Sequence, residues 1–178
     1  SAVMFVDALA FTTGLIEVEV IAYTGKDKTV FEWSDDFDGK AKVAFSPAVQ
    51  AEDILFLAGQ VSLNEKQQVV SFGDPEGQTN AVLNNIDKVL HQTNTPRGDI
   101  FKLFNFITYP HYADILQKGI GERFSHVPAS TTVTGGMGFP QLLVETEAYG
   151  VRGSAAEYLN SANNAFSTPG GTQSVKVG

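Results

Sequence analysis

The sequence predicts an α+β fold in which two helices pack on one face of a β-sheet. Residues 53–60 form a continuous apolar run of strand length, and residues 75–93 carry apolar side chains with the period of an amphipathic helix. From residue 41 onward, the strand-like and helix-like segments follow in the order β-β-α-β-α-β-β. Strands and helices in this order, without strict alternation, are typical of α+β domains.

The beginning of the chain predicts an additional β-hairpin. Residues 14–23 alternate strictly, with apolar side chains on one side and Glu17 and Glu19 on the other, which is the period of a half-buried strand. Residues 3–9 are apolar and β-prone, and the intervening residues 10–14 are suited to a turn. The polar, turn-rich segment that follows predicts a linker with at most one short strand, from Thr29 to Trp33.

Two helices are expected in the main part of the chain. Asp74 and Pro75 supply a capping side chain and a first-turn proline for the helix at residues 75–93. A weaker helix follows Pro110, because Tyr112, Leu116 and Ile120 recur on one side of it. The expected strands are 53–60, 67–72, 100–108, 130–134 and 142–149, the last two forming a hairpin. The expected organisation is a hairpin at 1–23, a linker at 24–40, a domain at 41–151 and a flexible tail at 152–178.

Composition excludes several functional classes. Twenty acidic and twelve basic residues give a net charge of −8 without a dense basic cluster, which disfavours binding to nucleic acid. An uninterrupted apolar run of about 18 residues is absent from the sequence, so no membrane span is expected. The chain has no cysteine, and its three histidines share no metal-ligand spacing, so no metal site is expected. The first residues lack the features of a signal peptide, and a cytoplasmic location is the expectation.

Two segments of the chain repeat each other. Residues 14–19, Gly-Leu-Ile-Glu-Val-Glu, match residues 142–147, Leu-Leu-Val-Glu-Thr-Glu, so that Glu17 corresponds to Glu145. Each copy is the second strand of an expected hairpin. Chance similarity between two β-strands is the alternative explanation.

A series of short motifs between residues 41 and 151 resembles the Rid family, whose name stands for reactive intermediate deaminase and which is also called YjgF or endoribonuclease L-PSP. In order, the motifs are Phe45-Ser-Pro-Ala-Val49, Leu57-Ala-Gly-Gln60, Leu83-Asn-Asn-Ile86, Asp99-Ile-Phe-Lys102, Pro128-Ala-Ser-Thr-Thr-Val133 and Leu143-Val-Glu-Thr-Glu-Ala148. The resemblance implies a chorismate-mutase-like fold and a trimer with ligand sites between subunits. It also implies hydrolysis of 2-imino or enamine acids to 2-oxo acids and ammonia without a cofactor.

The sequence departs from the family pattern at several expected site positions. Ser130 stands where the family has an arginine that grips the substrate carboxylate, and a serine cannot form that bidentate contact. Phe45 replaces a tyrosine, Ala58 a serine and Leu116 an asparagine, whereas the water-positioning acid is retained as Glu145. The resemblance implies substrate-binding positions at Phe45, Ala58, Gly59, Ser130 and Thr131.

The first 23 residues resemble the last hairpin of a preceding Rid domain, with Ser1 or Ala2 opposite Ser130. This leads to the hypothesis that a tandem precursor is cleaved before Ser1. An N-terminal serine combines a hydroxyl nucleophile with an amine that can act as its general base. Glu17 would face it across the hairpin. The alternative is that Ser1 results from truncation or from a tag.

Two hypotheses about function follow. In the first, the protein is a divergent Rid-type hydrolase of a small imine, enamine or amide, with Ser1, Glu17 and Glu145 as candidate catalytic residues at an interdomain or intersubunit cleft. In the second, it binds a small ligand without turnover and is regulatory or structural. The expected assembly is a trimer or pseudo-trimer, in which a separate chain could supply the rest of the first Rid domain.

Overall fold

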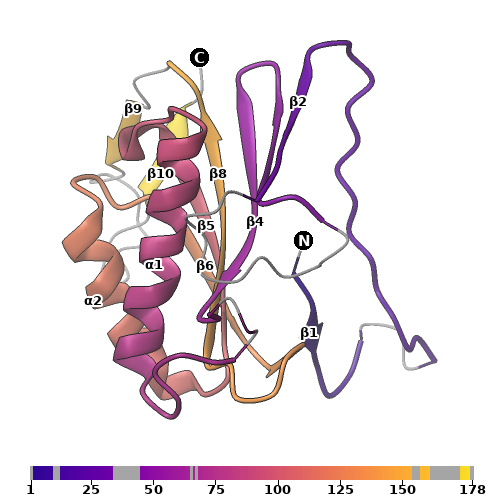
Figure 1. Cartoon of the computed structure of the whole chain (residues 1–178), viewed down its shortest axis with the longest axis vertical. Coiled ribbons are helices and arrows are strands. Elements are labelled where there is room, and N and C mark those ends of the chain that lie inside the picture. The colour runs from indigo at the N-terminus through magenta and orange to yellow at the C-terminus, as the bar shows by residue number, and fades with distance from the viewer. Residues whose placement is uncertain are drawn as a thin grey trace.

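A six-stranded mixed sheet carries both helices on one face (Figure 1). The computed structural model describes residues 2–9, 13–33, 45–64, 66, 68–153, 157–160 and 173–176. The strand order is β2 (Lys28–Phe31), β3 (Ala48–Ala51), β4 (Ile54–Val61), β8 (Val144–Val151), β5 (Ile100–Ile107) and β6 (Ala129–Thr134). Neighbouring strands are antiparallel except β5 and β6, which are parallel. The α+β prediction and the two-helix arrangement are therefore confirmed.

Helix α1 (Pro75–Gln92) begins where the sequence indicated. The Asp74 carboxylate accepts hydrogen bonds from the backbone N–H groups of Glu76 and Gly77 at 3.1 and 3.0 Å. Helix α2 (Ala113–Arg123) packs beside α1 and follows the short 3₁₀ turn η2 (Pro110–Tyr112). The main core lies between these helices and the sheet, and its fully buried side chains include Leu55, Val82, Ile86, Leu103, Leu116, Ile120 and Val144.

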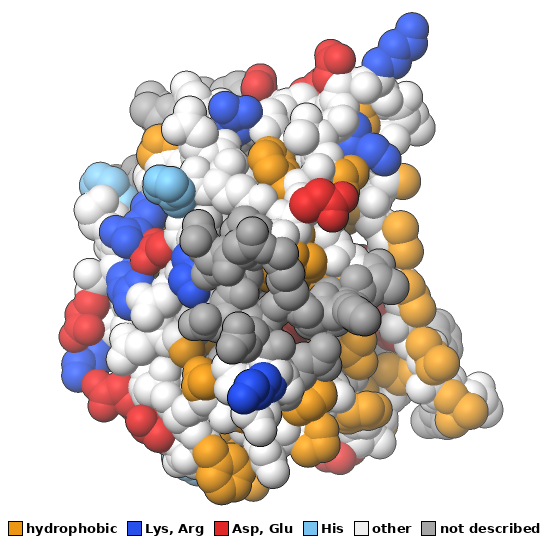
Figure 2. All heavy atoms as spheres, in the orientation of Figure 1, with side chains coloured by type: hydrophobic (Ala, Val, Ile, Leu, Met, Phe, Trp, Pro, Cys, Tyr) orange, Lys and Arg blue, Asp and Glu red, His pale blue; other side chains and the backbone are white. Residues whose placement is uncertain are grey.

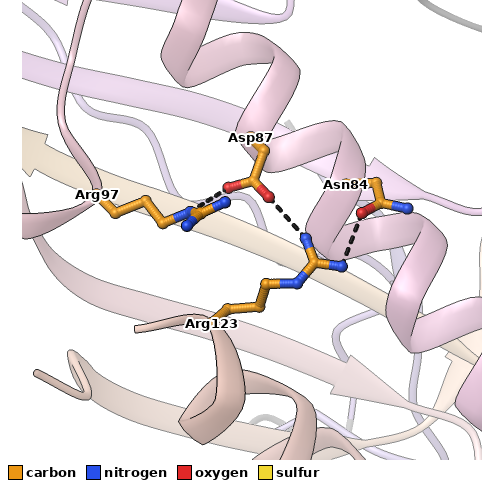
Figure 3. Close-up of polar contacts among 4 residues, drawn as sticks. All are labelled: Asn84, Asp87, Arg97 and Arg123. Carbon is orange, nitrogen blue, oxygen red and sulfur yellow. Dashed lines mark hydrogen bonds and ion pairs between the residues drawn. The ribbon is translucent and has the colours of Figure 1, made fainter. Parts of the chain in front are cut away.

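A polar network holds the outer sides of the helices together (Figure 3). The Asp87 carboxylate on α1 accepts hydrogen bonds from Arg97 in the turn η1 (Arg97–Asp99) and from Arg123 at the end of α2. Arg123 also donates to the Asn84 side-chain oxygen at 2.7 Å. One carboxylate with two guanidinium groups thus links α1, η1 and α2.

The other face of the sheet carries a second apolar cluster beneath the N-terminal segment. Strand β1 (Met4–Phe5) pairs with β7 (Gly136–Met137), which places Met4 against this cluster. Its buried members are Phe106, Met137 and Leu142. We refer to this side of the sheet as the open face, because no described helix covers it.

The prediction of a hairpin at the beginning of the chain is wrong. Strand β1 pairs with β7, and residues 14–23 form no strand in the described part of the chain. A two-stranded hairpin without a further sheet or helix to pack on is only marginally stable. The short strand expected within the linker, from Thr29 to Trp33, is present as the edge strand β2 at residues 28–31.

Three other strand expectations need correction. Residues 130–134 and 142–149 are strands but not a hairpin, because β5 lies between them and pairs with both. Of the strand expected at 67–72, residue 67 lies outside the described residues, and residues 68–72 form only a bridge between Val69 and Leu63. Turn formation in that polar segment outweighs its local β propensity.

The tail prediction is wrong for two segments of four residues. Strands β9 (Glu157–Asn160) and β10 (Gln173–Lys176) pair with each other antiparallel, and the residues between them lie outside the described part. Both segments contain β-prone residues that an average composition over residues 152–178 conceals.

Candidate active site

Glu145 is a buried acid in the centre of the open face. On β8 it lies between Val61 of β4 and Phe106 of β5, and the alternation along the strand directs it away from the helices. Its relative exposure is 6%. A carboxyl group is thus held among apolar neighbours on a rigid central strand.

A bulge in β4 creates the space for this carboxyl group. The pairing between β4 and β8 shifts between Leu57 and Gln60, so that β4 contains an extra residue beside Glu145. At Gly59, an added Cβ would collide with the Glu145 carboxylate. The absence of a side chain at Gly59 therefore permits the acid to lie directly against the β4 backbone.

The environment raises the pKa of Glu145 to about 7. Burial is the main cause, because it disfavours the charged form, and the negative charge of Glu147 adds to it. An acid with this pKa exists in both protonation states near neutral pH. It is therefore suited to accept and return a proton within one reaction cycle.

A second polar group lies on the same face, beside Glu147. The Tyr149 hydroxyl donates a hydrogen bond to Glu147 Oε2 at 3.1 Å, and burial, Glu147 and Glu19 together raise the pKa of Tyr149 to about 12. Lys102 Nζ lies 5.5 Å from the Tyr149 ring centroid and 5.6 Å from that of Phe104. The open face thus combines a cation, aromatic rings and a carboxylate.

Ser130 does not share the face of Glu145. Its register neighbour on β5 is Leu103, a core residue under the helices, and its hydroxyl oxygen accepts hydrogen bonds from Asn105 Nδ2 at 2.8 Å and Gln117 Nε2 at 3.2 Å. These two donors occupy both acceptor positions of the hydroxyl. Ser130 thus retains only its proton to offer to a ligand, from the solvent-exposed edge strand.

The remaining expected site residues are dispersed. Thr131 is on the open face, in register with Phe104. Phe45 packs edge-on against Trp33 with ring centroids 6.0 Å apart, and Ala58 is buried in the bulge of β4. Glu17 lies in the exposed segment 14–23, and the structure does not bring it into contact with Glu145. Ser1 lies outside the described residues.

Within one chain, all three arginines have partners away from Glu145. The chain has three arginines, of which two bind Asp87 on the helices (Figure 3) and the third, Arg152, donates to Gln50 Oε1 at 2.9 Å. Lys102 is four residues along β5 from Phe106, the neighbour of Glu145, which corresponds to about 13 Å along the strand. Within one chain, Lys102 is too distant to hold a small substrate at Glu145.

Sequence reasoning missed the polar residues that support this region. Asn105 is fully buried, and its side-chain oxygen accepts a hydrogen bond from Thr146 Oγ1 at 2.9 Å while its amide binds Ser130. An asparagine inside the otherwise apolar strand 100–107 was the available signal, because buried amides need several partners. Lys102 was a second signal, because it is a charged residue within the same largely apolar strand.

The described part of the chain lacks two other features. It contains no group of three or more histidine, aspartate or glutamate residues arranged to hold a metal ion. None of its helices is both long and apolar enough to span a bilayer.

Comparison with known proteins identifies the family. The profile of the family described as Endoribonuclease L-PSP matches residues 38–152, which is more than half of the chain. The chain belongs to the endoribonuclease L-PSP family. This confirms the resemblance to Rid proteins, since that is another name of the same family.

Individual relatives agree with this assignment. A RutC family protein of Pyrococcus horikoshii is 34% identical over 59 residues, a match that spans 33% of this chain and 47% of that relative. The Rid family protein YyfA of Yersinia pestis is 29% identical with a TM-score of 0.63, covering 70% of this chain and 99% of YyfA. The YjgF gene product of E. coli, at 21% identity, TM-score 0.58 and coverages of 64% and 92%, shows the same fold.

Proposed function

We propose that this Rid family protein hydrolyses a small imine, enamine or amide, with Glu145 as the group that transfers the proton. The observation that carries the proposal is the buried carboxyl group, whose pKa is about 7, at the Gly59 bulge. Its position on a central strand fixes the carboxyl geometry, and its pKa allows both required protonation states near neutral pH.

The proposed reaction can be written for an imine. The carboxylate of Glu145 accepts a proton from water as the water oxygen bonds to the imine carbon. The protonated acid gives this proton to the imine nitrogen, which yields a carbinolamine. Glu145 then takes the proton of the carbinolamine hydroxyl and delivers it to the nitrogen as the carbon–nitrogen bond breaks and the carbonyl bond forms. The products are a carbonyl compound and ammonia, or an amine where the nitrogen is substituted.

We propose that the substrate carries no carboxylate group. Residue 130 is a serine, and all three arginines are engaged elsewhere. A substrate that carries a carboxylate would bring a further negative charge beside Glu145 and Glu147, which would raise the pKa of Glu145 further and reduce the fraction of Glu145 present as the carboxylate base. We therefore expect neutral imines and amides to be better substrates than 2-imino acids.

The site is proposed to be completed between chains of a homo-oligomer. Glu145 and Ser130 lie on opposite faces of the sheet in one chain, and the open face beside Glu145 carries half-buried aromatic residues such as Phe104 and Tyr149. A neighbouring copy would cover this face and exclude water from the acid.

The test is ammonia release from a panel of small imines generated in situ, with and without a carboxylate, and from primary amides. Glu145→Gln should reduce turnover at least about 100-fold while the fold is retained. Glu122→Gln, at an exposed position on α2, is the matched control and should leave turnover unchanged. Turnover that is equal in both variants excludes Glu145 from the mechanism.

The alternative is binding without turnover, and the lack of an arginine at the site favours it. It predicts that the panel gives no ammonia above the uncatalysed rate, while ligands still bind. Calorimetric titration with stable carbonyl analogues of the same panel would then detect binding that Glu145→Gln alters.

A further inference from the structure

Residues 14–23 form an extended apolar segment that is exposed to solvent. The relative exposures are 95% for Leu15, 82% for Ile16, 73% for Val18, 75% for Val20 and 59% for Ile21. Figure 2 shows hydrophobic side chains in a line along the edge of the molecule where this segment runs in Figure 1. A continuous apolar surface of this kind is unusual on a soluble domain and indicates an interaction site.

The sequence repeat shows what environment the segment fits. Residues 14–19 repeat residues 142–147, and the last four of these begin the central strand β8. The side chains of β8 that face the helices are Val144, Thr146 and Ala148, and each is completely buried. The equivalent residues of the segment are Ile16, Val18 and Val20.

Each of these three residues is at least as apolar as its counterpart in β8, which is Val144, Thr146 or Ala148. A strand with this pattern is stable only when one face is covered by helices and both edges are paired, as β8 is by α1, β4 and β5. The charged face of the segment also matches, since Glu17 and Glu19 correspond to Glu145 and Glu147.

A second copy of this chain does not offer that environment. In each copy, β8 already fills the position between β4 and β5. Antiparallel pairing of two such segments about Val18 would place Glu17 of one copy opposite Glu19 of the other on the same face. Like charges directly opposite each other destabilise a strand pair.

We propose that residues 14–23 complete the sheet of another domain of this same fold, entering between the strands equivalent to β4 and β5. The segment supplies the central strand that such a partner lacks, and the partner supplies the helices that bury Ile16, Val18 and Val20. This is recognition by strand addition, in which backbone hydrogen bonds give affinity and alternate side chains give specificity. The inference does not depend on the proposed hydrolysis.

The experiment uses an acceptor made from this chain. Its residues 144–151 are replaced by a Gly/Ser sequence to vacate the strand position, and Ile16→Asp with Val18→Asp prevents its own segment from filling the gap. The acceptor is refolded with a synthetic peptide of residues 142–153, under conditions chosen so that this peptide restores the helical circular dichroism signal. A peptide of residues 13–24 is then tested under the same conditions.

The proposal expects the peptide of residues 13–24 to restore the fold and to protect the amides of α1 and β5 from hydrogen exchange. The Val18→Asp peptide should bind at least about tenfold more weakly, because it would bury a charge. The Thr24→Asp peptide carries the same charge beyond the strand and should bind like the unmodified one. Restoration by the β8 peptide alone, or equal binding of the two Asp peptides, overturns the proposal.

A second measurement uses the full chain. When the acceptor is added to the isotopically labelled full chain, the amides of residues 15–22 should become protected from exchange. In the full chain alone they should exchange rapidly, since the segment is unpaired there. Unchanged exchange in the presence of a 100-fold excess of acceptor would also overturn the proposal.

Discussion

Replacing Glu145 by glutamine should remove a pH dependence of stability that the buried acid imposes. The pKa of Glu145 rises from the ordinary value of 4.5 to about 7 in the folded protein. The unfolded chain therefore loses the proton at a lower pH than the folded chain does. The stabilising contribution is fully present below pH 4.5 and is lost as the pH rises through 7.

The magnitude follows from the pKa difference. A shift of roughly 2.5 units corresponds to about 3 kcal/mol of unfolding free energy, of which about 2 kcal/mol is lost by pH 6 and nearly all by pH 8. Glutamine has the same shape without the titration. The Glu145→Gln variant should therefore lack this decline, and its advantage over the unmodified protein should grow by about 3 kcal/mol between pH 4.5 and pH 8.

Urea unfolding at pH 4.5, 6, 7 and 8 measures this difference directly. Other titrating groups are common to both proteins, so the effects of those that do not interact with Glu145 cancel in the comparison. Parallel stability curves for the two proteins would show that Glu145 titrates normally. In that case Glu145 would be almost fully ionised at neutral pH and would not serve as a proton donor there.

Two further substitutions test the surroundings of the acid. Gly59→Ala should displace the flexible end of Glu145 towards solvent, lower turnover and weaken the pH dependence of stability described above. Gly98→Ala is the control and should have none of these effects, because an added Cβ there meets nothing within 4 Å. Turnover assays and urea unfolding measure the effects of the two substitutions. Asn105→Ala should cost about 2–3 kcal/mol of unfolding free energy, because Thr146 and Ser130 lose a buried partner. Exposed Asn80→Ala is the control, and equal effects in urea unfolding would contradict a structural role of Asn105.

The sequence allowed local features to be predicted well. The N-cap at Asp74 and the helical period of residues 75–93 depend on neighbouring residues, and α1 appears as expected. Strand pairing depends on distant residues, which is why the strands at 130–134 and 142–149 were expected to pair with each other and instead both pair with β5.

In the candidate site, too, features that depend on neighbouring residues were predicted, and features that depend on distant residues were not. Its acid was identified from the motif around Glu145, but burial and the bulge at Gly59 arise only when β4 and β8 pair. Glu17 has the same sequence surroundings as Glu145 and was expected to act beside it. The structure leaves Glu17 in an unpaired segment, because the repeat carries the strand pattern without the neighbouring strands.

The position of Ser130 leads to a prediction about assembly. Within one chain its hydroxyl is on the helix side of β6, whereas Glu145 is on the open face of β8. If both serve one ligand, they must come from different copies across an interface. Glu145→Gln and Ser130→Glu variants, each inactive alone, should then recover activity when their subunits are mixed and exchanged.

In an equal mixture with free exchange, about a quarter of the interfaces would pair an intact Glu145 with an intact Ser130. The matched control mixes unmodified protein with the double variant, where exchange should lower activity from about a half to about a quarter of the unmodified value. Light scattering coupled to size exclusion establishes the assembly, and mass spectrometry of labelled subunits establishes exchange. Exchange without recovery of activity would show that Ser130 and Glu145 do not form a shared site. A site within one chain would instead keep half of the activity in the control mixture, because each intact chain then acts independently of its neighbours.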